Sequence, residues 1–173
     1  MTSDKLHLGC GTDYKIGWHN VDVNETVEVD QRIDLNQQTW DVPSNTFRKI
    51  LASHVFEHLD SIEHALRECH RVLEPEGSLV VHMPIGENLH ADPDHQHEWR
   101  WQTPEYYCGS RHWDVDTGFE VTNRGVNLWS TLGGYRGKLH RWSLKARLET
   151  VGAGRWCFSE PYTGGEFLVR FQA

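Results

Sequence analysis

The stretch Lys5-Leu-His-Leu-Gly-Cys-Gly-Thr12 decides how the rest of the chain is interpreted. Apolar residues run directly into Gly9-Cys10-Gly11, which predicts a short buried strand that ends in a tight turn. Two small residues in such a turn let a ligand approach the backbone where side chains would block it. A dinucleotide fingerprint has a third glycine, but Tyr14 stands in its place, so the support for a phosphate-binding loop is weak. These residues alone leave two interpretations open, a ligand-binding loop and a plain glycine turn.

Polar residues follow at the ends of further strand-like pieces. Asp22 closes the second piece, and its carboxylate is able to accept hydrogen bonds from both hydroxyls of a ribose. Asp34 stands in the third piece and Ser53 ends the fourth. Because the carboxyl ends of parallel strands meet at one edge of a sheet, these residues predict a ligand crevice there. The second to fifth predicted strands span residues 18–23, 32–35, 47–53 and 77–84.

A helix is predicted from about Ser61 to Leu73. Its apolar positions recur with helical spacing on one face, and Asp60 is predicted to cap its first turn together with Glu63. Pro75 and Gly77 then end the helix and lead into the fifth strand, which makes a βαβ crossover. The apolar face comprises Ile62, Ala65, Leu66, Cys69, Val72 and Leu73.

Three segments in this order carry a family resemblance. LHLGCGT, NVDV and SHVFEHLDSIEHALRECHRVLEPEGSLVVHMP resemble the class I S-adenosylmethionine-dependent methyltransferases, and in particular their small type 11-like group. The resemblance covers roughly residues 5–105. It implies an α/β, Rossmann-like fold with a mostly parallel sheet, and it implies S-adenosyl-L-methionine as the cofactor.

The resemblance also implies roles for individual residues. Gly9 and Gly11 would approach the methionyl and ribose parts of the cofactor, and Asp22 would hold the ribose. Asp34 with Leu35 would border the adenine. Ser53 and His54 would close the site below the sulfonium. The cofactor-binding residues expected in this way are His7, Gly9, Cys10, Gly11, Asp22, Asp34, Leu35, Ser53 and His54.

The chain departs from the family pattern at several points. His7 stands where an acidic residue of the family normally contacts the methionine amino group. Asp13 stands where the methyltransferase pattern, as distinct from the dinucleotide fingerprint, has its third glycine. Only about ten residues separate Gly9 from the second strand, whereas a parallel crossover usually takes about a dozen or more. We therefore expect a reduced first helix, and we expect no N-terminal helices that cap the cofactor.

Composition indicates one globular domain over residues 1–173, with residues 114–173 as C-terminal strands and an insertion. The formal charge of −8 disfavours nucleic acid as the main partner. Sequence Ala52-Ser-His-Val also lacks the Pro-Pro turn of DNA amino-methyltransferases. The four cysteines are widely spaced, which favours reduced thiols and a cytoplasmic location. We see no signal peptide and no apolar run of membrane length.

The sequence His54-Val-Phe-Glu-His58 has a rival interpretation, because H-x-x-E-H is a zinc-protease pattern. A zinc site of that kind needs both histidines on one helical face, a third ligand elsewhere and the glutamate aimed at a bound water. A strand is predicted to run directly into His54, so we expect no metal here and keep a zinc hydrolase only as an alternative. A structural role in hydrogen bonding the loop is the simpler interpretation of Glu57.

Residues 86–113 are predicted to form a lid over the acceptor site. The lid contains a segment rich in His, Asp and Trp, His90 to Trp101, which resembles a segment of the same methyltransferase group. His95 or His97 would face the acceptor, and the tryptophans would exclude water. Two alternatives stay open: a metal site formed by these histidines with Asp92 or Asp94, and a loop anchored by satisfied polar side chains.

The C-terminal third offers two strands, Phe119–Thr122 and Glu166–Phe171, which would complete a seven-stranded sheet as an antiparallel hairpin. Trp129, Trp142 and Trp156 are predicted to be core residues.

The predicted activity is an in-line methyl transfer from S-adenosylmethionine to a small-molecule or glycan-like acceptor. His54, His95 and His97 are the candidate catalytic bases, because an imidazole titrates near neutral pH. A second alternative is a binding module or inactive chain that serves a partner subunit, and a homodimer is a further option.

Overall fold

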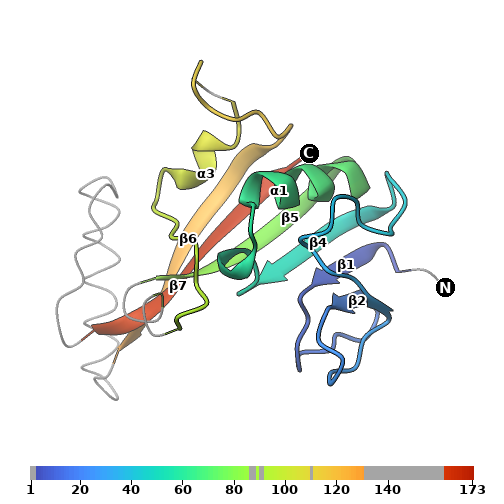
Figure 1. Ribbon diagram of the computed structural model, residues 1–173. Helices are drawn as coiled ribbons and strands as arrows, with labels where there is room; N and C mark the ends of the chain where they lie inside the picture. Colours follow the sequence, from blue (N-terminus) through green and yellow to red (C-terminus); the bar gives the residue numbers. More distant parts are fainter. Residues whose placement is uncertain (1–2, 86–88, 90–91, 110, 131–161) are drawn as a thin grey trace.

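The computed structural model describes residues 3–85, 89, 92–109, 111–130 and 162–173 (Figure 1). Seven strands form one sheet in the order β3-β2-β1-β4-β5-β7-β6. β1 to β5 are parallel to one another, and β7 runs antiparallel to both β5 and β6. This confirms the predicted Rossmann-like α/β fold. The strands are β1 Lys5–Leu8, β2 His19–Asp22, β3 Gln31–Arg32, β4 Phe47–Ser53, β5 Leu73–Ile85, β6 Glu120–Ser130 and β7 Tyr162–Gln172.

Helix α1, Ile62–Val72, is the predicted amphipathic helix and contacts β5. Its apolar face is buried as expected, and Cys69 is fully enclosed. The predicted cap was wrong: Ser61, not Asp60, is the N-cap residue, and its hydroxyl accepts a hydrogen bond from the His64 N–H at 3.2 Å. The described residues also include two short helices, η1, Phe56–His58, and α3, Thr103–Tyr106.

The first crossover contains only turns, which confirms the reduced first helix. Asn20 holds this connection because its buried side chain accepts a hydrogen bond from the Lys15 N–H and donates to the carbonyls of Lys15 and Trp18. The Asp30 carboxylate also lies 2.9 Å from the amide nitrogen, so three acceptors share its two N–H groups. A buried amide with this full set of partners fixes the loop without a helix.

The third strand is shorter than predicted. β3 ends at Arg32, so Ile33, Asp34 and Leu35 lie in the segment that follows it. Asp34 accepts a hydrogen bond from the Asn36 N–H at 2.9 Å, a local turn that competes with strand pairing.

One apolar core combines buried residues of β1, β2, β4, β5, β7 and α1. The predicted C-terminal hairpin is confirmed by the antiparallel pairing of β6 with β7. Trp142 and Trp156 lie outside the described residues, and the same holds for the side chain of Trp129. No helix in the described ranges is long and apolar enough to cross a membrane.

Glu68 joins α1 to the loop before β4. Its carboxylate accepts hydrogen bonds from the Trp40 N–H and from Arg71, at 2.7 to 2.8 Å. Burial alone would raise the pKa of Glu68, but the Arg71 guanidinium and the Trp40 N–H together hold that pKa below its ordinary value. The ionised carboxylate is therefore the form that stabilises the folded chain.

We predict that Glu68→Gln lowers the free energy of unfolding by about 2 kcal/mol at neutral pH, because Arg71 loses its charged partner. A depressed carboxyl pKa stabilises the fold above the unfolded-state pKa, and this contribution is lost as the pH falls through the folded-state pKa. Urea unfolding should thus show a difference that shrinks in acid. Glu63→Gln is the matched control, since Glu63 pairs with Arg67 on the exposed side and should cost less than about 0.5 kcal/mol. Equal losses in both variants would contradict the assignment.

Candidate functional site

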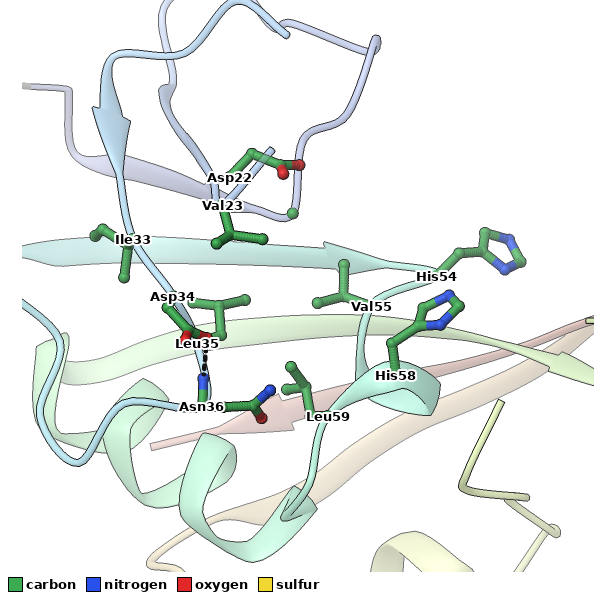
Figure 2. A pocket seen from close by; sticks show the side chains of 11 residues that line it. Asp22, Val23, Ile33, Asp34, Leu35, Asn36, His54, Val55, His58 and Leu59 are labelled. Atoms are coloured by element: carbon green, nitrogen blue, oxygen red, sulfur yellow. Dashed lines mark hydrogen bonds between the residues drawn. The ribbon is translucent and has the colours of Figure 1, made fainter. Parts of the chain in front are cut away.

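A pocket of about 250 Å³ opens at the carboxyl ends of β1, β2 and β4 (Figure 2). This is the edge where the sequence predicted a ligand crevice. Figure 2 shows Asp34 and Leu35 on one side of the pocket and His54 and His58 on the opposite side. The lining residues are Gly9, Asp22, Val23, Ile33, Asp34, Leu35, Asn36, His54, Val55, His58 and Leu59.

Gly9 forms the floor of the turn after β1. Its φ of +54° lies in the left-handed region, and a Cβ added there would lie 2.5 Å from Cγ2 of Val55. Gly11 also has a positive φ, +51°, but a Cβ there would meet no atom within 4 Å. Glycine is therefore needed at the two positions for different reasons. At position 9 it lets two loops pack closely, and at position 11 it leaves open space above the turn.

Asp22 ties the glycine turn to the end of β2. One carboxylate oxygen accepts a hydrogen bond from the Gly11 N–H at 2.7 Å, and the other accepts one from the Asn24 N–H at 2.8 Å. A carboxylate has about four acceptor positions, so two remain for a ligand. The side chain is thus already oriented for hydroxyl groups that enter the pocket.

Part of the pocket wall is apolar. Ile33, Leu35 and Leu59 are buried residues that line the pocket, and Val23, which also lines it, is 63% exposed. Such a wall suits a flat, weakly polar ring. Asp34 is exposed beside it and keeps one hydrogen bond, to Asn36.

His54 lies at the end of β4 with its imidazole between two carboxylates. Nδ1 is 3.4 Å from Oε1 of Glu57, and Nε2 is 3.4 Å from Oε2 of Glu166. Glu57 is the main cause that raises the pKa of His54; burial opposes it and Glu166 adds to it. The residue also has a φ of +56°, a strained value for a non-glycine residue of the kind that concentrates at functional sites.

Two further polar residues join this end of the sheet. Oε2 of Glu166, on β7, is also 3.4 Å from Nδ1 of His82, on β5. The same nitrogen lies 3.4 Å from the Ser53 hydroxyl. Burial lowers the pKa of His82. Neither Glu166 nor His82 was predicted as a site residue; Glu166 reaches this edge only through the β5–β7 register, which brings it opposite Pro84.

Several predicted cofactor residues support the turn and do not line the pocket. His7 is buried, with Nδ1 3.2 Å from the Asn20 amide oxygen, and burial lowers its pKa. Cys10 is buried, and burial raises the pKa of its thiol. Gly11 and Ser53 are likewise absent from the lining.

His95 and His97 lie on the segment after β5, which is hydrogen-bonded to η1 through the Gln96 N–H and the Glu57 carbonyl. Nδ1 of His95 is 2.9 Å from the Leu89 carbonyl, and Nε2 of His97 is 2.7 Å from the Leu59 carbonyl. His97 therefore anchors the segment, whereas the ring of His95 stacks edge-on with that of His58, 4.8 Å between centroids. Trp99, further along, is buried against Phe56. Closure of residues 86–113 over an acceptor stays a prediction.

The H-x-x-E-H pattern spans the end of β4 and the three-residue turn η1. Residues 54–58 therefore do not form the α-helical face that the zinc-protease arrangement needs.

Comparison with known families agrees with this geometry. The sequence profile of a family described as a methyltransferase domain matches residues 6–81. This match confirms the predicted resemblance to the class I methyltransferases of the type 11 group over 76 of the 173 residues. None of the curated proteins compared matches the sequence.

Solved methyltransferase structures share the fold over nearly the whole chain. An S-adenosylmethionine-dependent methyltransferase from Archaeoglobus fulgidus is 15% identical with a TM-score of 0.64, over 99% of this chain and 86% of that one. One from Mesorhizobium loti is 16% identical with a TM-score of 0.54, over 98% and 90%. A chain solved in complex with the Trm112 methyltransferase activator from Haloferax volcanii is 14% identical with a TM-score of 0.54, over 100% and 83%.

The two glycines give a matched pair for a stability test in this chain. We predict that Gly9→Ala lowers the free energy of unfolding by about 3 kcal/mol, from backbone strain plus the clash with Val55. Gly11→Ala carries only the strain, about 1 kcal/mol. In urea unfolding, Gly9→Ala combined with Val55→Ala should lose less than the sum of the single variants. Strict additivity would show that the two loops do not press on one another.

Proposed function

We propose that this chain transfers the methyl group of S-adenosylmethionine to a small-molecule or glycan-like acceptor. The observation that carries the proposal is the pocket at the carboxyl ends of β1, β2 and β4, which joins a preoriented carboxylate, an apolar wall and a paired histidine. In open parallel sheets this edge, beside the reversal of strand order, is where ligands bind.

The residues of the pocket fit the cofactor. Asp22 would accept the ribose hydroxyls with its two remaining acceptor positions, next to the open space above Gly11. Ile33 and Leu35 would pack against the adenine ring, with Asp34 at its polar edge. The glycine turn would lie along the methionyl part. When bound, the cofactor supplies an activated methyl group on a sulfonium.

His54 would then act at the acceptor. Its ring lies at the opposite end of the pocket from Leu35 (Figure 2), and each of its nitrogens lies 3.4 Å from a carboxylate oxygen, Nδ1 from Glu57 and Nε2 from Glu166. To act as the base, Nε2 would turn from Glu166 to the acceptor while Nδ1 stays beside Glu57. A carboxylate beside an imidazole stabilises the imidazolium that forms when the ring accepts a proton from a hydroxyl or amine. The chain's main contribution is thus to orient the acceptor and accept its proton.

The first test is cofactor binding. We predict that Asp22→Asn weakens S-adenosylmethionine binding by about 10- to 100-fold, because one acceptor oxygen becomes a donor and charge-assisted hydrogen bonds are lost. Titration calorimetry with the cofactor and its demethylated product measures the change. Asp13→Asn is the control, since Asp13 is an exposed carboxylate outside the pocket that pairs with Lys15. A folded Asp22→Asn chain that binds with full affinity would refute the ribose assignment.

The second test is transfer. With methyl-labelled cofactor and a panel of hydroxyl and amine acceptors, we predict that His54→Gln lowers turnover by about 10²- to 10⁴-fold with little change in cofactor affinity. The exposed His112→Gln variant should keep the wild-type rate.

The main alternative is a chain that binds S-adenosylmethionine without transferring its methyl group and serves a partner subunit. Support for it comes from the neighbour that was solved in complex with an activator. It predicts cofactor binding but no labelled product with any acceptor when the chain is alone.

A further inference from the structure

Three potential metal ligands come together beside the pocket. Glu57 and His58 belong to η1, and His95 belongs to the segment after β5. One ligand atom from each of these side chains lies within 4.8 Å of the other two. The Gln96 N–H donates to the Glu57 carbonyl at 2.7 Å, so the backbone holds the two segments against each other.

The Glu57 carboxylate is the unusual member of the group. The residue is 0% exposed, and neither carboxylate oxygen has a hydrogen-bond partner. Its ion-pair contact with Nδ1 of His54, at 3.4 Å, is longer than the usual hydrogen-bond range of about 2.7 to 3.2 Å. A buried carboxylate without partners is costly, and in proteins such groups are paired or coordinate a metal. This side chain therefore points to a cation.

The hydrogen bonding of His95 prepares it for the same role. Because Nδ1 lies 2.9 Å from the Leu89 carbonyl, which only accepts, the proton is on Nδ1. Nε2 then carries the lone pair, and Oδ2 of Asp92 is 3.8 Å from it. A backbone carbonyl that fixes the tautomer of an imidazole is the usual outer-shell partner of a metal-binding histidine.

We propose that Glu57, His58 and His95 bind one divalent transition-metal ion. Two imidazoles and one carboxylate suit first-row ions such as Zn²⁺ and Co²⁺, whereas Mg²⁺ prefers oxygen ligands only. Ligand atoms about 2.1 Å from a tetrahedral ion lie about 3.4 Å apart, so the three side chains, whose ligand atoms now lie within 4.8 Å of one another, would turn inward on binding. Three protein ligands leave a coordination position open. This proposal replaces the expectation of no metal, with a ligand set that leaves out His54.

The ion would lie at the acceptor end of the pocket, because His58 belongs both to the pocket wall and to the ligand group. This inference rests on the proposed function. An ion at that place favours an acceptor that offers a hydroxyl oxygen to the open coordination position of the ion. A metal-bound hydroxyl loses its proton more easily. Glu166 keeps its contact with Nε2 of His54, so that ring retains a carboxylate partner.

The test is Co²⁺ titration of the full chain after treatment with a chelator. We expect one equivalent to bind with visible d–d absorption, Zn²⁺ to displace it, and Mg²⁺ at the same concentration to have no effect. Glu57→Gln and His95→Ala should each weaken Co²⁺ binding by at least about 10-fold. His112→Ala, which removes an exposed histidine elsewhere, should bind as the unaltered chain does.

Three results would overturn the proposal: no Co²⁺ bound by the unaltered chain, unchanged affinity in Glu57→Gln, or loss in His112→Ala equal to that in His95→Ala. Near-UV circular dichroism checks that each variant folds. If Glu57→Gln or His95→Ala does not fold, His58→Ala takes its place, because His58 is a proposed ligand at a partly exposed position. Calorimetry of the metal-free chain with S-adenosylmethionine is run in parallel. Cofactor binding without Co²⁺ binding refutes only the metal site, and the reverse result refutes only the proposed function.

Discussion

The parallel pairing of β1 with β4 is the constraint on which the rest of the structure depends. The chain starts at β1 in the middle of the sheet, extends outward through β2 and β3, and returns to the other side of β1 as β4. The loops after β1 and β4 therefore leave neighbouring strand ends in opposite directions and open a crevice between them. Gly9 and Val55, one on each loop, pack so closely that no Cβ fits at Gly9. The pocket exists because these two strands are neighbours.

The short first connection shows how the chain manages without the usual helix. Parallel strands normally need about a dozen residues or more between them, and here Asn20 replaces the helix's hydrogen bonds with its own side chain. Asp30 reinforces it, because its carboxylate also accepts the Asn20 N–H at 2.7 Å. Asp22 completes the arrangement by binding the Gly11 N–H. The turn is thus held by side chains from β2 and the loop after it, so the ribose-binding candidate is also a structural residue.

Local patterns were sufficient for the elements that depend on local physics. The fourth strand, 47–53, was predicted with the observed bounds, and the helical period placed α1 within a residue at each end. Asp34 was misplaced into a strand because alternating apolar residues gave no sign of its turn with Asn36. Glu166 could not be placed from the sequence, because it reaches the site only by pairing with Pro84 of β5, which lies more than eighty residues earlier in the chain. The proximity of His95 to Glu57 was hidden for the same reason: it arises from the path of the chain after β5.

The carboxylates at the proposed acceptor end of the pocket lie beside histidines, which offset their negative charge when protonated. Glu57 and Glu166 both lie beside His54, at 0% and 15% side-chain exposure. Methyl transfer disperses the positive charge of the sulfonium, so bare carboxylates facing it would stabilise the ground state more than the transition state and slow the reaction. Pairing Glu166 with both His54 and His82 reduces that field, and a cation on Glu57 would reduce it further. Under the proposed function, the grouping of imidazoles with these carboxylates would therefore allow an acidic strand edge to accept a cationic methyl donor.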